Sequence, residues 1–349
     1  MRTPLNRRQF LKLTMLAAGG LFPRSSHPYL PADDQQPPLG WGRVTIAYLR
    51  VYSQPSYKSN PVGWRRRDEI LPIHEEVISA SWPVSNPRWY RITNGYAHSA
   101  YIQRLDDAQL NPPAKWVPEK GQLGELTVPF SDSLRPLSRG RWEPLYRLYY
   151  HTIHWVTGIL EGPDREPWYQ LTDELLHVRY AVPAAHIRLV SNAEYTPLAT
   201  DVPDSEKRIE VSLREQVLTA YEGDQVVLRA DVSSGIPTSG PSENGIPTDT
   251  PAGKFNVALK MPSKHMGDGE LTSDYQAYEL LGVPWNCFFV STGVAFHGTY
   301  WHDNFGQRMS HGCVNMRNEN ALWLFRWTTP VIHPGEWFAK GRGTAVHVY

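Results

Sequence analysis

Short runs of alternating apolar and polar residues, separated by Pro, Gly and Asn, occupy most of the chain between residues 41 and 290. Such alternation places successive side chains on opposite faces of a β-strand, and the turn residues separate one strand from the next. We therefore predict a mainly β protein. The main exception lies near the C-terminus, where apolar residues at helical spacing between 321 and 325 follow the polar pair Asn318 and Glu319.

Residues 41–107 predict a small barrel of short strands, and residues 123–191 predict a looser second copy of it. Trp89-Tyr90-Arg-Ile92-Thr93 in the first copy matches Trp168-Tyr169-Gln-Leu171-Thr172 in the second. Two further matches support the duplication. They pair Leu49-Arg-Val51 with Leu126-Thr-Val128, and Ser99-Ala100-Tyr-Ile102 with Ala184-Ala185-His-Ile187.

The order of these elements resembles the bacterial SH3-like (SH3b) domain. That resemblance implies modules that bind cell-wall peptides or glycan. An alternative interpretation is that Trp89 and Trp168 are core residues, because large aromatic side chains are usually buried.

The N-terminus predicts export. Arg7 and Arg8 precede Phe10-Leu11-Lys12 and a short apolar run, a pattern that resembles a twin-arginine signal. The protein is therefore expected in the cell envelope, outside the cytoplasm, with a membrane anchor at the N-terminus if the signal is not cleaved. The alternative is a basic amphipathic start of a cytosolic protein.

Charge and cysteine content narrow the function further. Basic and acidic residues balance at 35 each, and no Lys/Arg block of the kind that serves nucleic-acid binding is present, so such binding is not expected. Of the two cysteines, Cys287 lies in the apolar run from Pro284 to Val290 and is expected to be a small core residue, unpaired with Cys313.

The second cysteine lies in the stretch that predicts chemistry. Cys313 follows Ser310-His311-Gly312, and the motif His297-Gly298-Thr299 lies upstream. A free thiol titrates near pH ~8.5, so a nucleophilic cysteine at neutral pH needs a histidine as base. We expect Cys313 in a loop just before a helix N-terminus, whose dipole would favour a thiolate. These parts suit acyl transfer through a thioester.

The same residues resemble the signature of the L,D-transpeptidase (YkuD/ErfK) catalytic domain family. The signature is a histidine, some fifteen residues, then Ser/Thr-His-Gly-Cys, a hydrophobic residue and Asn or Arg; here Val314 and Asn315 complete it. Upstream, Ser234-Gly235 and Thr250-Pro-x-Gly253-x-Phe255 agree with the family. The resemblance implies a β-sandwich of two mixed sheets with few short helices, and an active site under a lid. The segment from Met261 to Pro284 has few strand signals, so we expect a long loop there that acts as a lid.

The resemblance also implies roles for individual residues. Cys313 would be the nucleophile and His297 its base, oriented by the Gly298 carbonyl. Backbone N–H groups of His311, Gly312 and Cys313 would form the oxyanion hole, beside Ser310. Substrate-binding residues implied at the site are Thr299, Asn315 and Arg317.

The implied partners are peptidoglycan stem peptides. The implied reaction releases D-Ala from a tetrapeptide stem through a Cys thioester and forms 3→3 cross-links in cell-wall biogenesis, with no cofactor and no metal. Alternatives are an L,D-carboxypeptidase and a non-catalytic wall-binding protein. Chemically, His311 could also be the base, and a zinc set of His297, His302, His311 and Cys313 fits no common ligand spacing.

The predicted organisation is therefore as follows: an export signal at 1–26, a linker at 27–40, an SH3b-like domain at 41–107, a linker at 108–122, a second SH3b-like domain at 123–191, a linker at 192–205 and an L,D-transpeptidase catalytic domain at 206–349.

Overall fold

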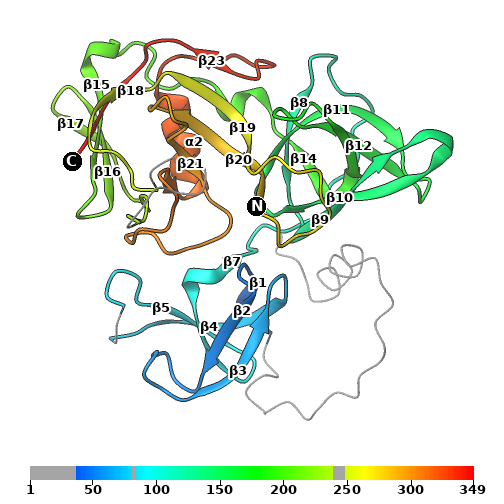
Figure 1. Ribbon diagram of the computed structural model, residues 1–349, viewed down its shortest axis with the longest axis horizontal. Coiled ribbons are helices and arrows are strands. Elements are labelled where there is room, and N and C mark those ends of the chain that lie inside the picture. Colours follow the sequence, from blue (N-terminus) through cyan, green and yellow to red (C-terminus); the bar gives the residue numbers. More distant parts are fainter. Residues whose placement is uncertain (1–36, 81–82, 239–247) are drawn as a thin grey trace.

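The computed structural model describes residues 37–80, 83–238 and 248–349. The predicted export signal and most of the linker after it lie outside the described residues. Four β-sheets form three bodies, with the N-terminal one in blue to cyan, the middle one in green and the C-terminal one in yellow-green to red (Figure 1). Helix α2 (Asn318–Trp327) is the only α-helix in the described ranges, so the predicted mainly β class is confirmed.

The N-terminal sheet has seven strands in the order β3-β2-β6-β5-β4-β1-β7. The strands are β1 (Gly40–Val44), β2 (Tyr48–Tyr52), β3 (Pro61–Arg66), β4 (Ile70–Ile78), β5 (Arg88–Ile92), β6 (Gly95–His98) and β7 (Ile102–Arg104). Their alternating apolar side chains enclose one small core, which includes Val44, Ile73 and Ile92. A 3-10 turn, η2 (Ser99–Tyr101), leads into β7.

The middle sheet repeats this topology, in the order β10-β9-β13-β12-β11-β8-β14. Its strands are β8 (Gln122–Leu126), β9 (Phe130–Pro136), β10 (Trp142–Tyr149), β11 (Ile153–Glu161), β12 (Pro167–Thr172), β13 (Arg179–Pro183) and β14 (Ile187–Leu189). Matching β1 with β8 and continuing in sequence gives the same strand order in both sheets. The topology therefore supports the predicted duplication, while the likeness to the SH3b family stays a prediction.

Two of the three sequence matches fall on equivalent elements. Trp89 lies on β5 and Trp168 on β12, with 0% and 6% of their surface exposed, so both are core residues. The match of Leu49 with Leu126 is wrong, because Leu49 lies on β2 whereas Leu126 ends β8, the counterpart of β1. An apolar–polar–apolar triplet fits any half-buried strand, so it does not fix the alignment.

The C-terminal body contains two five-stranded sheets, ordered β17-β16-β15-β24-β18 and β22-β21-β20-β19-β23. The first comprises β15 (Lys207–Ser212), β16 (Val217–Glu222), β17 (Gln225–Asp231), β18 (Gly253–Asn256) and β24 (Ala345–Val348). The second comprises β19 (Leu259–Gly267), β20 (Glu279–Phe288), β21 (Ala295–Gly298), β22 (Val314–Met316) and β23 (Ala339–Lys340). Each has one parallel pair, β15 with β24 and β21 with β22, so both sheets are mixed, as expected.

Helix α2 packs against β20 and β21, and its buried face joins a core shared by both sheets. Cys287 on β20 is fully buried in this core, as predicted. The core also takes in Ile153 and Trp155 from the middle sheet, while Leu281 of β20 joins the middle sheet's own core. The middle and C-terminal bodies are thus joined by apolar contacts in both directions.

Two local expectations are wrong. Strands β19 and β20 extend through much of the segment expected to be a loop, and only residues 268–278 connect them as a hairpin. Cys313 precedes strand β22, and α2 begins only at Asn318, so the thiol does not lie at a helix N-terminus. The three buried residues of β22 pair with β21, and this pairing separates the cysteine from the helix.

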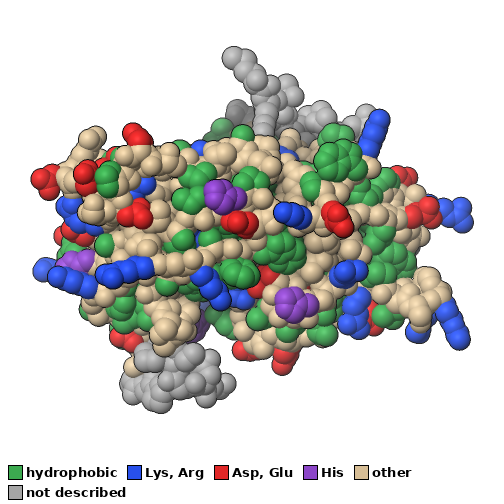
Figure 2. Space-filling model, turned by 90° about the horizontal axis from the view of Figure 1, so that it is seen from above, with side chains coloured by type: hydrophobic (Ala, Val, Ile, Leu, Met, Phe, Trp, Pro, Cys, Tyr) green, Lys and Arg blue, Asp and Glu red, His purple; other side chains and the backbone are tan. Residues whose placement is uncertain are grey.

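None of the described helices has the length and apolar character needed to cross a membrane. On the face shown in Figure 2, basic and acidic side chains are interspersed with apolar ones. This face therefore offers no extended surface of a single charge for nucleic acid.

Candidate active site

The parallel pair β21–β22 brings the predicted nucleophile and base together. In its register Phe296 lies opposite Val314 and His297 opposite Asn315, so Cys313 enters β22 beside the strand that carries His297. The His297 side chain is buried, and its Nδ1 lies 2.9 Å from the Gly298 carbonyl oxygen. Because a carbonyl can only accept, Nδ1 carries the proton and Nε2 keeps a free lone pair.

Burial keeps both groups neutral at rest. It lowers the pKa of His297 to about 4, and it raises the pKa of the Cys313 thiol to about 11. Cys313 nevertheless keeps part of its surface exposed, and its Sγ lies 3.8 Å from the Gly293 carbonyl. The site therefore does not hold a preformed thiolate–imidazolium pair, and a neutral His297 is available to accept the thiol proton during attack.

The loop before the cysteine is held by its own hydrogen bonds. Ser310 Oγ donates to the Cys313 carbonyl and accepts the Gly312 N–H at 3.2 Å. Thr250 Oγ1 donates to the Gly312 carbonyl at 2.7 Å, and Gly312 has a φ of 117°, which favours glycine. The Gly312 N–H is therefore already used. Within the described chain the N–H groups of His311 and Cys313 have no acceptor, and these remain for an oxyanion.

His302 supports the loop that carries Cys313 through contacts of both ring nitrogens. Its Nδ1 accepts the Asn304 N–H at 3.2 Å, and its Nε2 lies 2.9 Å from the amide group of Asn315. Burial lowers the pKa of His302 to about 3, so the ring is neutral and its one proton must be on Nε2. The side-chain oxygen of Asn315 must then accept this proton. The hydrogen bond fixes the Asn315 side chain, and Asn315 belongs to the segment that carries Cys313.

Cys313 and His297 line one cavity of about 380 Å³. Ser310, His311 and Asn315 line it too. The other two predicted substrate residues do not: Thr299 and Arg317 line a separate cavity of about 330 Å³, where Arg317 is paired with Asp303.

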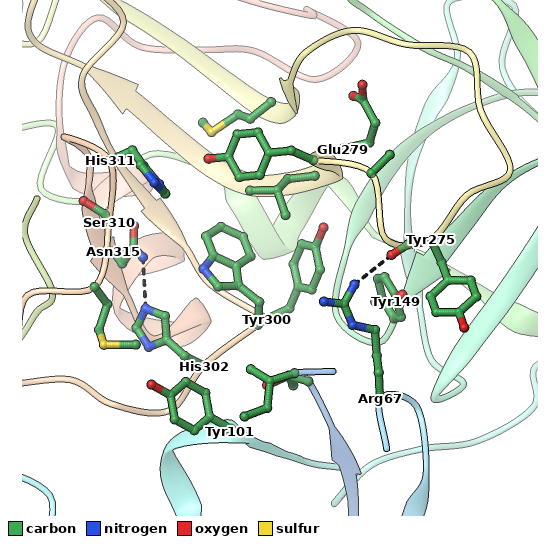
Figure 3. A pocket seen from close by; sticks show the side chains of 18 of the residues that line it. Arg67, Tyr101, Tyr149, Tyr275, Glu279, Tyr300, His302, Ser310, His311 and Asn315 are labelled. Carbon is green, nitrogen blue, oxygen red and sulfur yellow. Dashed lines mark hydrogen bonds between the residues drawn. The ribbon is translucent and has the colours of Figure 1, made fainter. Parts of the chain in front are cut away.

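Sequence reasoning missed the part of the cavity wall that the first two bodies supply. Arg43, Arg67 and Tyr101 come from the N-terminal body, and Tyr149 comes from the middle one. In Figure 3, Ser310 and His311 lie on one side, Arg67, Tyr149 and Tyr275 lie on the other, and Tyr300 lies between them. No local motif marks these residues, because only the packing of the three bodies brings them to Cys313.

The hairpin between β19 and β20 forms another wall of the cavity. Tyr278 lines the cavity, and its ring packs edge-on against His311 with 5.7 Å between the ring centres. The base of the hairpin is fixed to the middle body by His265, whose Nδ1 lies 2.7 Å from Asp173 and whose Nε2 lies 2.6 Å from Glu279. Desolvation lowers the His265 pKa, but hydrogen bonds and charge from Asp173 and Glu279 outweigh it and raise the pKa overall.

Among residues 37–80, 83–238 and 248–349, no cluster of three or more His, Cys, Asp or Glu side chains is placed to hold a metal ion. The imidazoles of His297 and His302 are instead held by the hydrogen bonds described above. The site is thus a cysteine–histidine site on a mixed β-sandwich.

Comparison with known families agrees with this class of site. Residues 206–348 match the model of the L,D-transpeptidase catalytic domain (YkuD), and this part of the chain belongs to that family. No curated protein matches the chain.

Solved structures similar to the chain include three L,D-transpeptidases. One from Xylanimonas cellulosilytica has 26% identity over 41% of this chain and 60% of its own, with a TM-score of 0.29. A mutant of one from Enterococcus faecium has 28% identity over 41% and 50%, with a TM-score of 0.30. One from Mycobacterium smegmatis has 18% identity over 50% and 75%, with a TM-score of 0.31. The chain thus spans 60% and 50% of the first two, and the family assignment rests on the domain model.

Proposed function

We propose that the protein is an L,D-transpeptidase that acts on peptidoglycan tetrapeptide stems through a thioester on Cys313. One observation carries the proposal: Cys313 and a neutral, buried His297 line the same cavity, and the Gly298 carbonyl holds His297 with Nε2 unprotonated. This arrangement supplies a nucleophile and a base without a carboxylate.

In the first step, Cys313 Sγ attacks the carbonyl carbon of the third stem residue while His297 Nε2 takes the thiol proton. The N–H groups of His311 and Cys313 would stabilise the oxyanion. The peptide C–N bond then breaks, His297 returns the proton to the leaving amine, and D-Ala departs. A thioester remains on Cys313.

In the second step, the amine of another stem attacks the thioester carbon and gives a proton to His297. The C–S bond breaks, a 3→3 cross-link forms, and the proton returns to the Cys313 sulfur. If water attacks in place of the amine, the product is a tripeptide and the enzyme is an L,D-carboxypeptidase.

The test is the mass of products after incubation of the whole chain with a disaccharide-tetrapeptide. Wild type should release D-Ala and form a stem dimer, and Cys313→Ala should do neither. Cys287→Ala is the matched control, because it removes the buried cysteine and should leave the reaction intact. Tripeptide without dimer would indicate hydrolysis, and no D-Ala release by wild type would refute the proposal in favour of a wall-binding role.

We further propose that the twin-arginine-like segment at 1–26 exports the protein to the cell envelope, and that the bodies at 41–107 and 123–191 are SH3b-like domains in contact with the wall. Because Trp89 and Trp168 are buried, any such contact would use other side chains. A fusion of residues 1–40 to a reporter, compared with Arg7→Lys/Arg8→Lys, tests the export proposal.

A further inference from the structure

One cation on the cavity wall has no ion pair. Arg67 lies in the turn between β3 and β4, and its Nη1 donates to the Tyr275 carbonyl at 2.8 Å. Its Nε is buried and has no partner in the described chain, and Nη2 has no partner there either. Because Nε is closed off, the guanidinium offers a ligand in the cavity its positive charge and its Nη2 N–H groups, which suit a carboxylate.

The neighbouring charged side chains are already in ion pairs with one another. Asp68 pairs with Arg43 at 2.8 Å and with Arg147 at 3.0 Å, and Arg147 also pairs with Asp132 at 2.6 Å. Three arginines at this end of the cavity, Arg67 included, therefore face two carboxylates.

The remaining acidic group on the cavity wall is also engaged. Glu279 contacts the His265 ring through Oε2 and accepts the Glu270 N–H through Oε1 at 2.6 Å. Of the charged side chains described on this wall, Arg67 is thus the one without a counter-ion.

The turn that carries Arg67 is rigid, so the guanidinium is held in place before a ligand arrives. The Arg67 N–H donates to the Ala47 carbonyl at 3.2 Å, and the Asp68 N–H donates to the Val44 carbonyl at 2.9 Å. The buried Asp68 carboxylate then ties the turn to the middle body through Arg147. Preorganisation of this kind lowers the cost of binding.

We propose that Arg67 binds a carboxylate of the peptide that occupies the cavity, so that the N-terminal body supplies a specificity-determining residue. This inference rests on the proposed function. The carboxylate is not that of the leaving D-Ala, which lies only about one residue (~3.8 Å) from the attacked carbonyl. Arg67 instead faces the cavity from the side opposite Ser310 and His311 (Figure 3). The ligand is an acidic group farther along the donor stem or on the acceptor stem.

The test uses the whole chain with synthetic stem peptides. Arg67→Gln removes the charge, while its amide can still donate to the Tyr275 carbonyl. Arg66→Gln is the matched control, because it removes an exposed arginine from the adjacent position. We expect Arg67→Gln to lower kcat/KM for D-Ala release or for cross-linking about tenfold, and Arg66→Gln to leave both unchanged.

Amidated peptides separate direct binding from support of the hairpin. In a donor arm the non-terminal carboxylates of the donor are amidated, and in an acceptor arm the carboxylates of the acceptor are amidated. In one of these two arms, kcat/KM of wild type should fall about tenfold. The same amidation should not lower kcat/KM of Arg67→Gln any further, because the arginine that would bind the carboxylate is already absent. Coupling in the donor arm assigns the carboxylate to the donor stem, and coupling in the acceptor arm assigns it to the acceptor stem.

The proposal would be overturned if Arg67→Gln had wild-type activity. It would also be overturned if the losses from the substitution and from amidation multiplied to about a hundredfold in kcat/KM with both the amidated donor and the amidated acceptor. Absence of D-Ala release by wild type would instead overturn the proposed function. Direct binding then decides on Arg67 separately: tetrapeptide should bind Cys313→Ala about tenfold more tightly than Cys313→Ala/Arg67→Gln, and equal affinities would overturn the role of Arg67.

Discussion

Replacement of Asp173 by Asn should loosen the hairpin that walls the cavity. Asp173 Oδ1 accepts the N–H groups of Leu175 and Leu176 at 2.9 and 2.7 Å, and Oδ2 contacts His265 at 2.7 Å. Asn can keep the first two bonds, but its NH₂ group would face a ring nitrogen that carries a proton. The side chains of Asp173 and His265 are 2% and 1% exposed, so solvent cannot compensate.

The expected loss is about 1.5–3 kcal/mol in the free energy of opening the hairpin, the range for a lost hydrogen bond to a charged group. It is less than the 3–5 kcal/mol typical of a broken buried ion pair, because Glu279 still contacts His265.

The loss should depend on pH in a definite sense. The folded-state pKa of His265 is raised above 6.5, so its contribution is fully present below about 6.5 and is lost as pH rises through the folded value. The folded-state pKa of Asp173 is lowered below 3.8, where hydrogen bonds from His265 and backbone N–H groups outweigh desolvation. Its contribution is present above 3.8 and is lost at lower pH. The effect of Asp173→Asn should therefore be largest between about pH 4 and 6.5 and should decrease as the pH rises through the folded-state pKa of His265.

Hydrogen exchange of the β19 and β20 amides measures this opening directly. Asp132→Asn is the matched control: it removes a carboxylate that is 46% exposed and should change exchange by less than about 0.5 kcal/mol. Equal protection in Asp173→Asn and wild type at about pH 5.5, or a loss that does not change while His265 titrates, would show that the His265 contacts do not hold the hairpin.

Three further predictions concern the catalytic pair and the contact between the first two bodies. His297→Asn should lower D-Ala release by at least about a hundredfold and His311→Asn by less than about tenfold; the reverse order would make His311 the base. Because the pKa of His297 is about 4, its neutral form should keep kcat/KM level from about pH 5 to 9, and a fall centred near 6.5 would contradict this. Asp68→Asn leaves Arg43 without its buried partner and removes the pairing of Asp68 with Arg147 of the middle body, so it should lower the melting temperature clearly more than Asp132→Asn; equal melting temperatures would argue against the Asp68–Arg147 ion pair as the link.

The placement of residues close in sequence could be predicted where the local pattern of side chains determines the structure. The histidine lies on β21 and the cysteine directly precedes β22, the next strand along the chain, so their spacing already indicated a common site. The helix from Asn318 was also predicted, because its apolar face has helical spacing. In contrast, β19 contains Met261-Pro-Ser-Lys-His265 and lacks clear alternation, and only its long pairing with β20 makes it a strand.

Contacts between the bodies could not be read from the sequence. Arg43, Arg67 and Tyr149 reach the cavity only because the two N-terminal sheets pack against the C-terminal body. Nothing in their immediate neighbours distinguishes them from other surface arginines and tyrosines. The charge arrangement around Asp68 is equally nonlocal, since its two partners lie 25 and 79 residues away.

The middle body therefore helps to form the cavity and to hold its walls in place. Leu281 of β20 is buried in the middle sheet's core, Ser263 Oγ donates to the Ile153 carbonyl at 2.5 Å, and His265 is held by Asp173. Residues 206–349 alone would expose Leu281 to water, leave His265 without Asp173 and open the cavity wall that carries Arg67 and Tyr149. Although the cysteine and histidine lie within the family's own domain, the shape and charge of the space around them belong to all three bodies. The cavity wall thus includes residues that the family's motif does not contain.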